Sequence, residues 1–239
     1  MKKEKTMYFE TSATAQLLGS KKIEASDNLM RKMSDLNVDW DHLIWELINN
    51  SIQAAEDRFL DCIVDLDFVF DEEEAYLLKK LSIRDQSGGI PFSNIGNCLQ
   101  PAKRNTNITT LNEHGMGLNT AIEYFTTNNA NYRLESHHEE GSYYTDETIS
   151  FHKPLSFYKL ESQDINGTTI IFDNLIDQTN LTYPHRHMMK AHQFWAKTCA
   201  KYRLKHEYFT QTMGKKFEIN MKFHKKDSII TRSYSPLKQ

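Results

Sequence analysis

The sequence lacks a strong excess of charge of either sign. It has 29 lysines and arginines against 32 aspartates and glutamates, which gives a formal net charge of −3 over 239 residues. Proteins that attract nucleic acid through their overall field carry a clear positive excess, so the bulk charge gives no reason to bind it. A local basic patch is not excluded.

Cysteines are few, and long apolar runs are absent. The cysteines form no C-x-x-C pair, which argues against a zinc site and a disulfide framework and fits a reducing cytosol. They are Cys62, Cys98 and Cys199. No apolar run approaches the roughly 20 residues that a membrane-spanning helix needs. The N-terminal MKKEKTMYFETSA also lacks the apolar core of a signal peptide, so we expect a cytoplasmic protein without membrane association.

What is present is the composition of a soluble globular protein, with 39% hydrophobic and 26% charged residues. The length allows one large domain, or one domain with a short appendage. The ten histidines include the adjacent His137 and His138 and the group His185-x-His187. Neither group has ligand-like neighbours in the sequence, so we interpret these histidines as surface residues rather than metal ligands.

The stretch from Asp41 to Ala55, DHLIWELINNSIQAA, is predicted to be a buried amphipathic helix. Its apolar residues recur at helical spacing, and no proline or glycine interrupts them. Glu46 and Asn50 are four residues apart and therefore share one face, with Gln53 on the next turn. A carboxylate and an amide on a mostly apolar helix need water or a ligand as a partner. The face is therefore either a helix edge that meets solvent or part of a binding site.

Periodicity predicts the remaining elements. Two alternating runs, 62–70 and 76–84, predict an antiparallel hairpin that ends at Asp85. Further strands are expected over 131–138, 143–152, 157–162, 168–172 and 217–223. Helices are expected over 118–125 and 184–209, and weakly over 12–34. The polar segment 91–117 is predicted to be a long functional or disordered loop, and the tail from Lys225 is expected to form no helix or strand.

Four motifs follow one another in order. They are E-x-x-x-N at 46–50, D-x-x-x-G at 85–89, G-x-G-L within HGMGLNTA at 114–121, and G-T-x-I within NGTTIIF at 166–172. Together they resemble the GHKL ATP-binding superfamily, which includes the ATPase component of DNA gyrase, the ninety-kilodalton heat-shock chaperones, MutL, sensor histidine kinases and the MORC ATPases. The resemblance covers roughly the first three quarters of the chain and is nearest to the MORC-like and MutL-like ATPase domains.

The resemblance implies an α/β two-layer sandwich of the Bergerat type, in which helices cover one face of a mixed, largely antiparallel sheet. It implies an ATP-binding domain over 1–180 and a C-terminal helix-and-strand extension over 181–239. That extension is similar to the region where MORC-type ATPase domains continue into their next domain. We therefore expect the native protein to be longer than this chain.

ATP hydrolysis requires an in-line water, a base that orients it and a cation that neutralises phosphate charge. Glu46 is the only carboxylate on the buried face of the predicted helix, so it is the candidate catalytic base. Asn50 offers an amide oxygen one turn later, which suits Mg²⁺. The resemblance implies the same two roles. Glu46 also favours the hydrolysing members over histidine kinases, which usually lack a carboxylate at this position.

Asp85, Gly89, Ile90 and Thr168 are the candidate adenine-binding residues. A carboxylate at a strand end, followed by glycines that admit a ligand close to the backbone, can accept a hydrogen bond from an adenine amino group. A plain turn after a strand would use the same residue types. The resemblance implies that Thr168 completes the adenine pocket.

Phosphate binding is predicted for the start of the helix at 118–125, because N–H groups and the positive dipole end attract anions there. The candidate residues are Gly115, Met116, Gly117, Leu118 and Asn119. Lys103, in the segment PAKRN, occupies the place where MORC-like ATPases carry a lid lysine, and is a further candidate. The alternatives are an ordinary helix-start loop and a solvated charged loop.

Three positions depart from the superfamily pattern. Gln53 stands where members usually have aspartate, Ser87 replaces a glycine, and Asn112 replaces the first glycine of the lid motif. Gln53 can still hydrogen-bond a water but carries no charge. ATP binding can survive these changes while turnover is slow.

The sequence thus predicts an ATPase with ATP and Mg²⁺ as ligands. The resemblance implies that ATP closes the lid, drives homodimer formation and signals to a downstream domain or partner, in DNA-associated or defence processes. The alternative is a non-hydrolysing module in which ATP binding alone switches a partner domain. Glu46 separates the two hypotheses, because a pure sensor needs no base.

Overall fold

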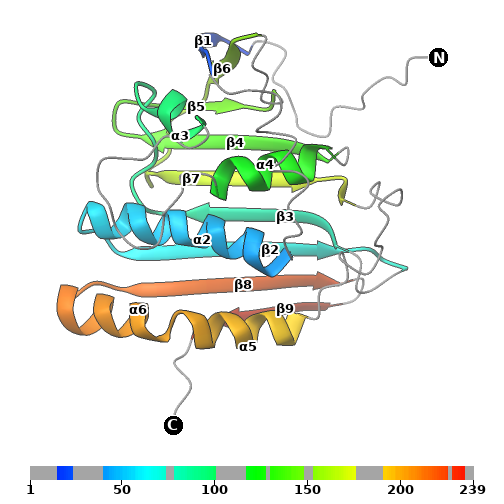
Figure 1. Ribbon diagram of the computed structural model, residues 1–239, viewed down its shortest axis with the longest axis vertical. Coiled ribbons are helices and arrows are strands. Elements are labelled where there is room, and N and C mark those ends of the chain that lie inside the picture. Colours follow the sequence, from blue (N-terminus) through cyan, green and yellow to red (C-terminus); the bar gives the residue numbers. More distant parts are fainter. Residues whose placement is uncertain are drawn as a thin grey trace.

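One nine-stranded sheet joins elements from the beginning to the end of the described chain (Figure 1). The computed structural model describes residues 15–23, 40–73, 78–100, 117–127, 130–147, 153–175, 191–225 and 228–234. The strand order is β1-β6-β5-β4-β7-β3-β2-β8-β9. The strands are β1 (Leu17–Lys21), β2 (Cys62–Phe70), β3 (Leu78–Asp85), β4 (Asn131–His138), β5 (Gly141–Thr145), β6 (Leu155–Lys159), β7 (Gly167–Asp173), β8 (Phe217–Lys225) and β9 (Ser228–Ser233).

The sheet is mixed. β8 runs parallel to β2, with Cys62 opposite Phe217. The other neighbouring pairs among the described strands are antiparallel. The α/β class and the mixed sheet confirm the coarse fold prediction.

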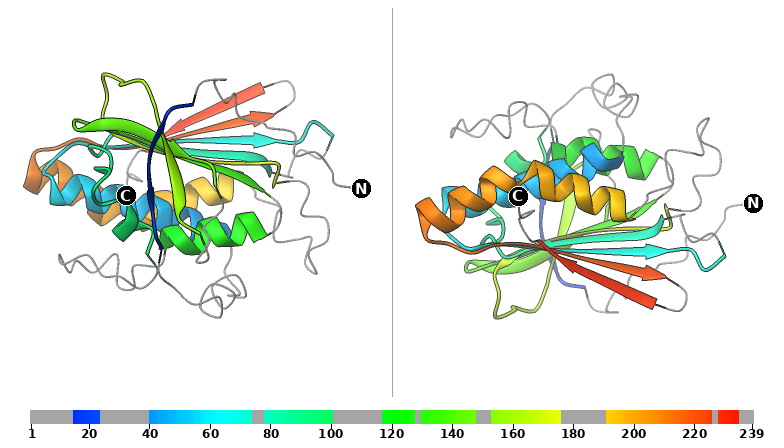
Figure 2. Two further views of the ribbon diagram at one scale, coloured as in Figure 1. Left: turned by 90° about the horizontal axis from the view of Figure 1, so that it is seen from above. Right: turned by 90° about the horizontal axis from the view of Figure 1, so that it is seen from below.

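The longer helices lie on one face of this sheet. Figure 2 shows α2 (Trp40–Asp57), α4 (Gly117–Thr127) and α5 (Ala191–Lys201) on the same side of the strands in both views. The shorter elements are α3 (Ile95–Cys98), α6 (Arg203–Glu207) and the π-helix η3 (Tyr208–Met213). The core that they share with the sheet includes Ile48, Ile122, Phe125, Phe194, Val64, Leu81 and Phe172.

α2 confirms the predicted helix at 41–55. The five apolar residues at helical spacing are each at most 2% exposed, and they are Leu43, Ile44, Leu47, Ile48 and Ile52. Burying this stripe stabilises a helix that propensity alone would leave marginal.

β2 and β3 confirm the predicted hairpin and its end at Asp85. Buried and half-buried residues alternate along the whole of β2, as period 2 requires. The register shifts between Val69 and Phe70, so that Val69 lies opposite Lys80 while Phe70 lies opposite Leu78. Leu78 is the buried residue at this end of β3, and Leu77 lies outside the described residues.

Two predictions near the ends of the chain are wrong. Residues 17–21 form β1 rather than part of a weak helix, and residues 228–233 form β9 where no element was expected. Both are edge strands with mostly exposed side chains, so neither sequence shows the alternation that marks a half-buried strand. Pairing with β6 and with β8 decides their conformation.

Residues 95–98 form the short helix α3 within the segment 91–117 that was predicted to be a loop, so that prediction is wrong there. The remaining elements agree in type and differ in extent. The helix at 118–125 and the strands at 131–138, 168–172 and 217–223 are α4, β4, β7 and β8. β5 spans Gly141–Thr145 and β6 spans Leu155–Lys159, so both predicted strands began too late and ended too late. The predicted helix at 184–209 is α5, α6 and η3 over its described part.

The described part of 181–239 joins the rest of the structure through β8, which pairs with β2, and through α5. The boundary at residue 180 stays a prediction. None of the helices in the described ranges has the length and apolar character that crossing a membrane demands.

Candidate functional site

Asp85, the last residue of β3, accepts hydrogen bonds from three parts of the chain. Its Oδ1 accepts from the backbone N–H of Ser87 (2.9 Å), the Ser87 hydroxyl (2.6 Å) and the N–H of Thr168 (3.2 Å). Its Oδ2 accepts from the Ser51 hydroxyl on α2 (3.1 Å). These donors fix the orientation of a carboxylate that is only 9% exposed. Among the described residues, Oδ2 accepts from Ser51 alone, so it keeps acceptor capacity for a further donor.

Gly167 makes the contact between Thr168 and Asp85 possible. A Cβ at Gly167 would lie 1.9 Å from the backbone oxygen of Asp85, so only glycine allows β7 to start this close to the end of β3. The sequence predicted Thr168 beside Asp85, and the structure brings the two together. The contact is made by the Thr168 backbone N–H.

Gly89 and Ile90 attach the segment after Asp85 to β4 and β5. Gly89 has φ +69°, and a Cβ there would lie 2.1 Å from the backbone oxygen of His137. The Ile90 N–H donates to Ser136 Oγ (2.7 Å), and the Ile90 carbonyl accepts from the hydroxyls of Ser136 (2.9 Å) and Tyr143 (2.8 Å). The backbones of both predicted residues therefore contact the sheet.

Sequence reasoning missed Ser51 and Arg58. Arg58 follows α2 and donates from Nη1 to the carbonyls of Ser87 and Gly89, the latter at 2.7 Å. Ser51 had a usable signal, because it is a polar residue on a mostly apolar helix directly after Asn50. Ser87 was predicted only as a departure from the superfamily pattern, and the structure makes it a donor to Asp85.

Glu46 and Asn50 lie one turn apart on α2, and both side chains are half-buried. At 1.5 Å per residue, they are separated by about 6 Å along the helix axis. Ser51 links this part of α2 to Asp85. Gln53 is 8% exposed and donates from Nε2 to Asp57 Oδ1 (2.7 Å), so the neutral residue at this position is bonded within its own helix.

α4 begins at Gly117, beside α2 (Figure 1). Leu118 is half-buried and Asn119 is fully buried in the first turn. The amide oxygen and nitrogen of Asn119 have no hydrogen-bond partner among the described residues. An unpaired buried polar group costs about 1–3 kcal/mol, and its presence at a helix start is consistent with a polar ligand there. Of the other phosphate candidates, Lys103, Gly115 and Met116 lie outside the described residues, as does Asn112.

His137 contradicts the prediction that the histidines are surface residues. It is 5% exposed, and its Nδ1 lies 3.0 Å from the Ser142 hydroxyl on the paired strand. Burial lowers the pKa of the imidazole, which favours its neutral form. Residues 134 and 137 point to opposite faces of β4. Histidine is not a hydrophobic residue, so the hydropathy pattern of the sequence did not reveal that His137 is buried. Within the described ranges, no group of three or more histidine, cysteine, aspartate or glutamate side chains is placed to hold a metal ion.

Comparisons with known proteins support the fold. No protein-family model matches the sequence, and no curated protein matches it. Among solved structures, the chain is similar to the crystal structure of the N-terminal domain of a DNA repair protein, with a TM-score of 0.52 and 14% identity. The match covers 86% of this chain and 54% of that one, so the chain spans about half the length of its solved relative. At this identity the likeness establishes a shared fold.

Proposed function

We propose that the chain binds ATP with Mg²⁺ and hydrolyses it, in a two-layer sandwich of the Bergerat type. The observation that carries the proposal is the hydrogen bond between Ser51 and Asp85. This bond joins Asp85, the predicted adenine acceptor, to the helix that bears Glu46 and Asn50. A bound nucleotide must contact both the acceptor and this helix. The buried amide of Asn119 on the neighbouring helix, which has no hydrogen-bond partner among the described residues, adds a polar group for the same ligand.

Each part has a chemical role in this proposal. Asp85 Oδ2 accepts the adenine amino group, while the Thr168 backbone keeps Oδ1 in place. The phosphates lie along α2 towards Asn50 and the start of α4, where N–H groups and the helix dipole favour anions. Lys103 and the Gly115 turn would add phosphate contacts.

The residues present suit Mg²⁺. This ion keeps several waters and takes one or two protein oxygens beside the phosphate oxygens of its substrate. The Asn50 amide oxygen supplies such a ligand without a cluster of carboxylates. When bound, Mg²⁺ neutralises charge on the phosphates.

Glu46 would act as the general base. Its carboxylate accepts a proton from the water that attacks the γ-phosphorus, as the bond to the ADP oxygen breaks.

A sensing module is the second candidate, and Gln53 favours it. The superfamily aspartate is replaced by an amide that is bonded to Asp57, so the site has less charge with which to order water. In either case, the likeness to a DNA repair protein domain is compatible with a DNA-associated role. Nucleotide-dependent homodimerisation and signalling to a downstream partner belong to the same proposal.

Calorimetric titration with ATP and Mg²⁺ tests the binding half. The native chain should bind ATP, and Asp85→Asn should abolish detectable binding because the amide replaces an acceptor oxygen with a donor. Asp67→Asn is the matched control, because Asp67 lies on β2 and contacts His224. Equal affinity in the Asp85 variant and the control would rule out this adenine site.

Steady-state ATP hydrolysis at several protein concentrations tests the proposed catalysis and the proposed dimer. Activity that rises faster than linearly with protein concentration supports a catalytic dimer. Binding without any turnover would establish the sensing module and reject hydrolysis.

A further inference from the structure

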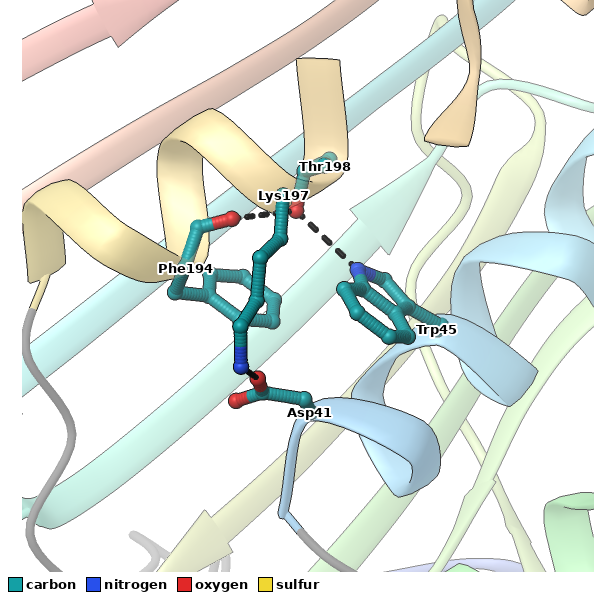
Figure 3. Close-up of polar contacts among 5 residues, drawn as sticks. All are labelled: Asp41, Trp45, Phe194, Lys197 and Thr198. Atoms are coloured by element: carbon teal, nitrogen blue, oxygen red, sulfur yellow. Dashed lines mark hydrogen bonds and ion pairs between the residues drawn. The ribbon is translucent and has the colours of Figure 1, made fainter. Parts of the chain in front are cut away.

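α5 is attached to α2 by polar and aromatic contacts (Figure 3). The Trp45 indole N–H donates to the Thr198 hydroxyl (3.0 Å), which donates to the Phe194 carbonyl (2.8 Å). The Trp45 ring stacks on Phe194 with centroids 6.0 Å apart. Lys197 forms an ion pair with Asp41 in the first turn of α2.

Residues beyond α5 continue the same attachment. The Tyr202 hydroxyl lies 2.9 Å from Asn49 Oδ1 and 3.2 Å from the Trp45 carbonyl, and can donate its single proton to either acceptor. Lys205 contacts Glu56 near the end of α2, at 2.7 Å. The contacted positions on α2 are Asp41, Trp45, Asn49 and Glu56, which lie along one stripe of the helix.

The residues proposed for catalysis each follow a residue of this stripe in the sequence. Glu46 follows Trp45 and Asn50 follows Asn49, so each is displaced from the stripe by one residue, about 100° around the helix. Tyr202 is 1% exposed. Burial raises the pKa of its hydroxyl, and the negative charge of Glu46 adds to that rise. The hydroxyl therefore stays protonated and remains a donor.

From these contacts we infer that Tyr202 is a positioning residue for Glu46, and that the α5–α6 segment thereby controls turnover at the α2 site. The inference rests on the proposed ATP hydrolysis. The hydrogen bond to Asn49 or to Trp45 fixes the rotation of the middle turn of α2, where Glu46 projects. A base displaced by about 1 Å can lower the rate about 100-fold, whereas ATP affinity depends mainly on Asp85 and the phosphate contacts.

The test compares Tyr202→Phe with Tyr208→Phe. Tyr208 is a tyrosine of η3 that is 39% exposed and belongs to no part of the proposed site. ATP affinity is measured by calorimetry, and turnover by single-turnover hydrolysis with enzyme in excess. Tyr202→Phe should keep the affinity within about twofold and lower turnover about tenfold or more. Tyr208→Phe should change neither.

Asn49→Ala removes the acceptor of the Tyr202 hydrogen bond. This variant provides a second test of the same interaction if Tyr202→Phe lowers stability. The double variant should turn over no more slowly than the slower single variant, because both changes remove one interaction. Native turnover in Tyr202→Phe, or a parallel loss of affinity and turnover, would overturn the positioning role. If the native chain hydrolyses no ATP, the proposed hydrolysis fails first, and the role of Tyr202 falls with it. That outcome differs from a failure of the positioning role alone, because it is seen in the native chain before any substitution is made.

Discussion

Ser51 on α2 donates to Asp85 at the end of β3, across 3.1 Å and 34 positions of sequence. The bond is the direct side-chain link between the helix with the candidate base and the strand end with the candidate adenine acceptor. Ser51 also lies 3.3 Å from the Leu47 carbonyl, so its hydroxyl has an alternative acceptor within α2. The site is therefore coupled through a hydroxyl that can alternate between two acceptors.

Ser51→Ala should lower both stability and ATP affinity. Hydrogen bonds to charged groups contribute about 1.5–3 kcal/mol, so a loss near the lower bound is expected in the free energy of unfolding. Losing one orienting donor of Asp85 should also weaken ATP binding by about tenfold, which corresponds to about 1.4 kcal/mol. Urea unfolding and calorimetry measure the two effects.

Thr126→Ala is the matched control for Ser51→Ala. The Thr126 hydroxyl bonds only the Ile122 carbonyl of its own helix among the described residues. The control should leave ATP affinity unchanged. Equal affinities in Ser51→Ala and the control would show that Asp85 does not need its α2 donor.

Glu46→Gln should preserve ATP binding and reduce hydrolysis. The amide keeps the shape of the side chain but cannot accept the proton of the attacking water. General bases contribute about 10²–10⁴-fold, so turnover should fall by at least 100-fold. Asp57→Asn, a carboxylate change at the exposed end of the same helix, should have little effect. Native turnover in Glu46→Gln would assign the base to another residue.

The elements that carry the candidate site were predictable from sequence, for a physical reason. α2, β2 and β3 bury one complete face, so the periodicity of their apolar residues reveals both their type and their ends. Asp85 was singled out as a candidate because it ends such a strand and begins the D-x-x-x-G motif of the superfamily resemblance. Ser51 and Arg58 were missed because their hydrogen-bond partners are distant in the sequence and leave no periodic trace. β1 and β9 were missed because their exposed residues carry no pattern.

Gly167→Ala should be strongly destabilising. The added Cβ would meet the Asp85 backbone oxygen at 1.9 Å, and neither backbone can move without disturbing the β3–β7 pairing. Overpacking of this kind costs about 1–3 kcal/mol and sometimes more. Thermal unfolding measures the loss.

Gly96→Ala provides the contrast. A Cβ there would contact Lys21 side-chain atoms at 3.6 Å, which is ordinary packing. Stability should change by less than about 1 kcal/mol, because alanine is also the better helix former. Equal losses in the two variants would show that close approach at Gly167 is not the cause.

His137 should make the fold less stable in mild acid. Burial lowers its folded-state pKa, so the unfolded chain binds a proton more readily. The contribution of neutral His137 is complete above the unfolded pKa of about 6.5 and is lost as the pH falls below that value towards the folded pKa. His137→Gln should therefore lose less stability than the native chain between neutral and mildly acidic pH. Thermal melts across that range measure it, and parallel pH profiles would exclude His137 as the cause.

The parallel pairing of β2 with β8 also has a consequence for synthesis on the ribosome. Asp65 pairs with Asn220, which is 155 positions later in the sequence. One of the two edges of β2 therefore stays unpaired until most of the chain has been synthesised. At roughly 5–20 residues per second, that delay is about 8–30 s. During this time a central strand has an exposed edge, the kind that recruits other chains. Nascent chains that stop before residue 217 should therefore aggregate or depend on chaperones, although they already contain every residue of the candidate site.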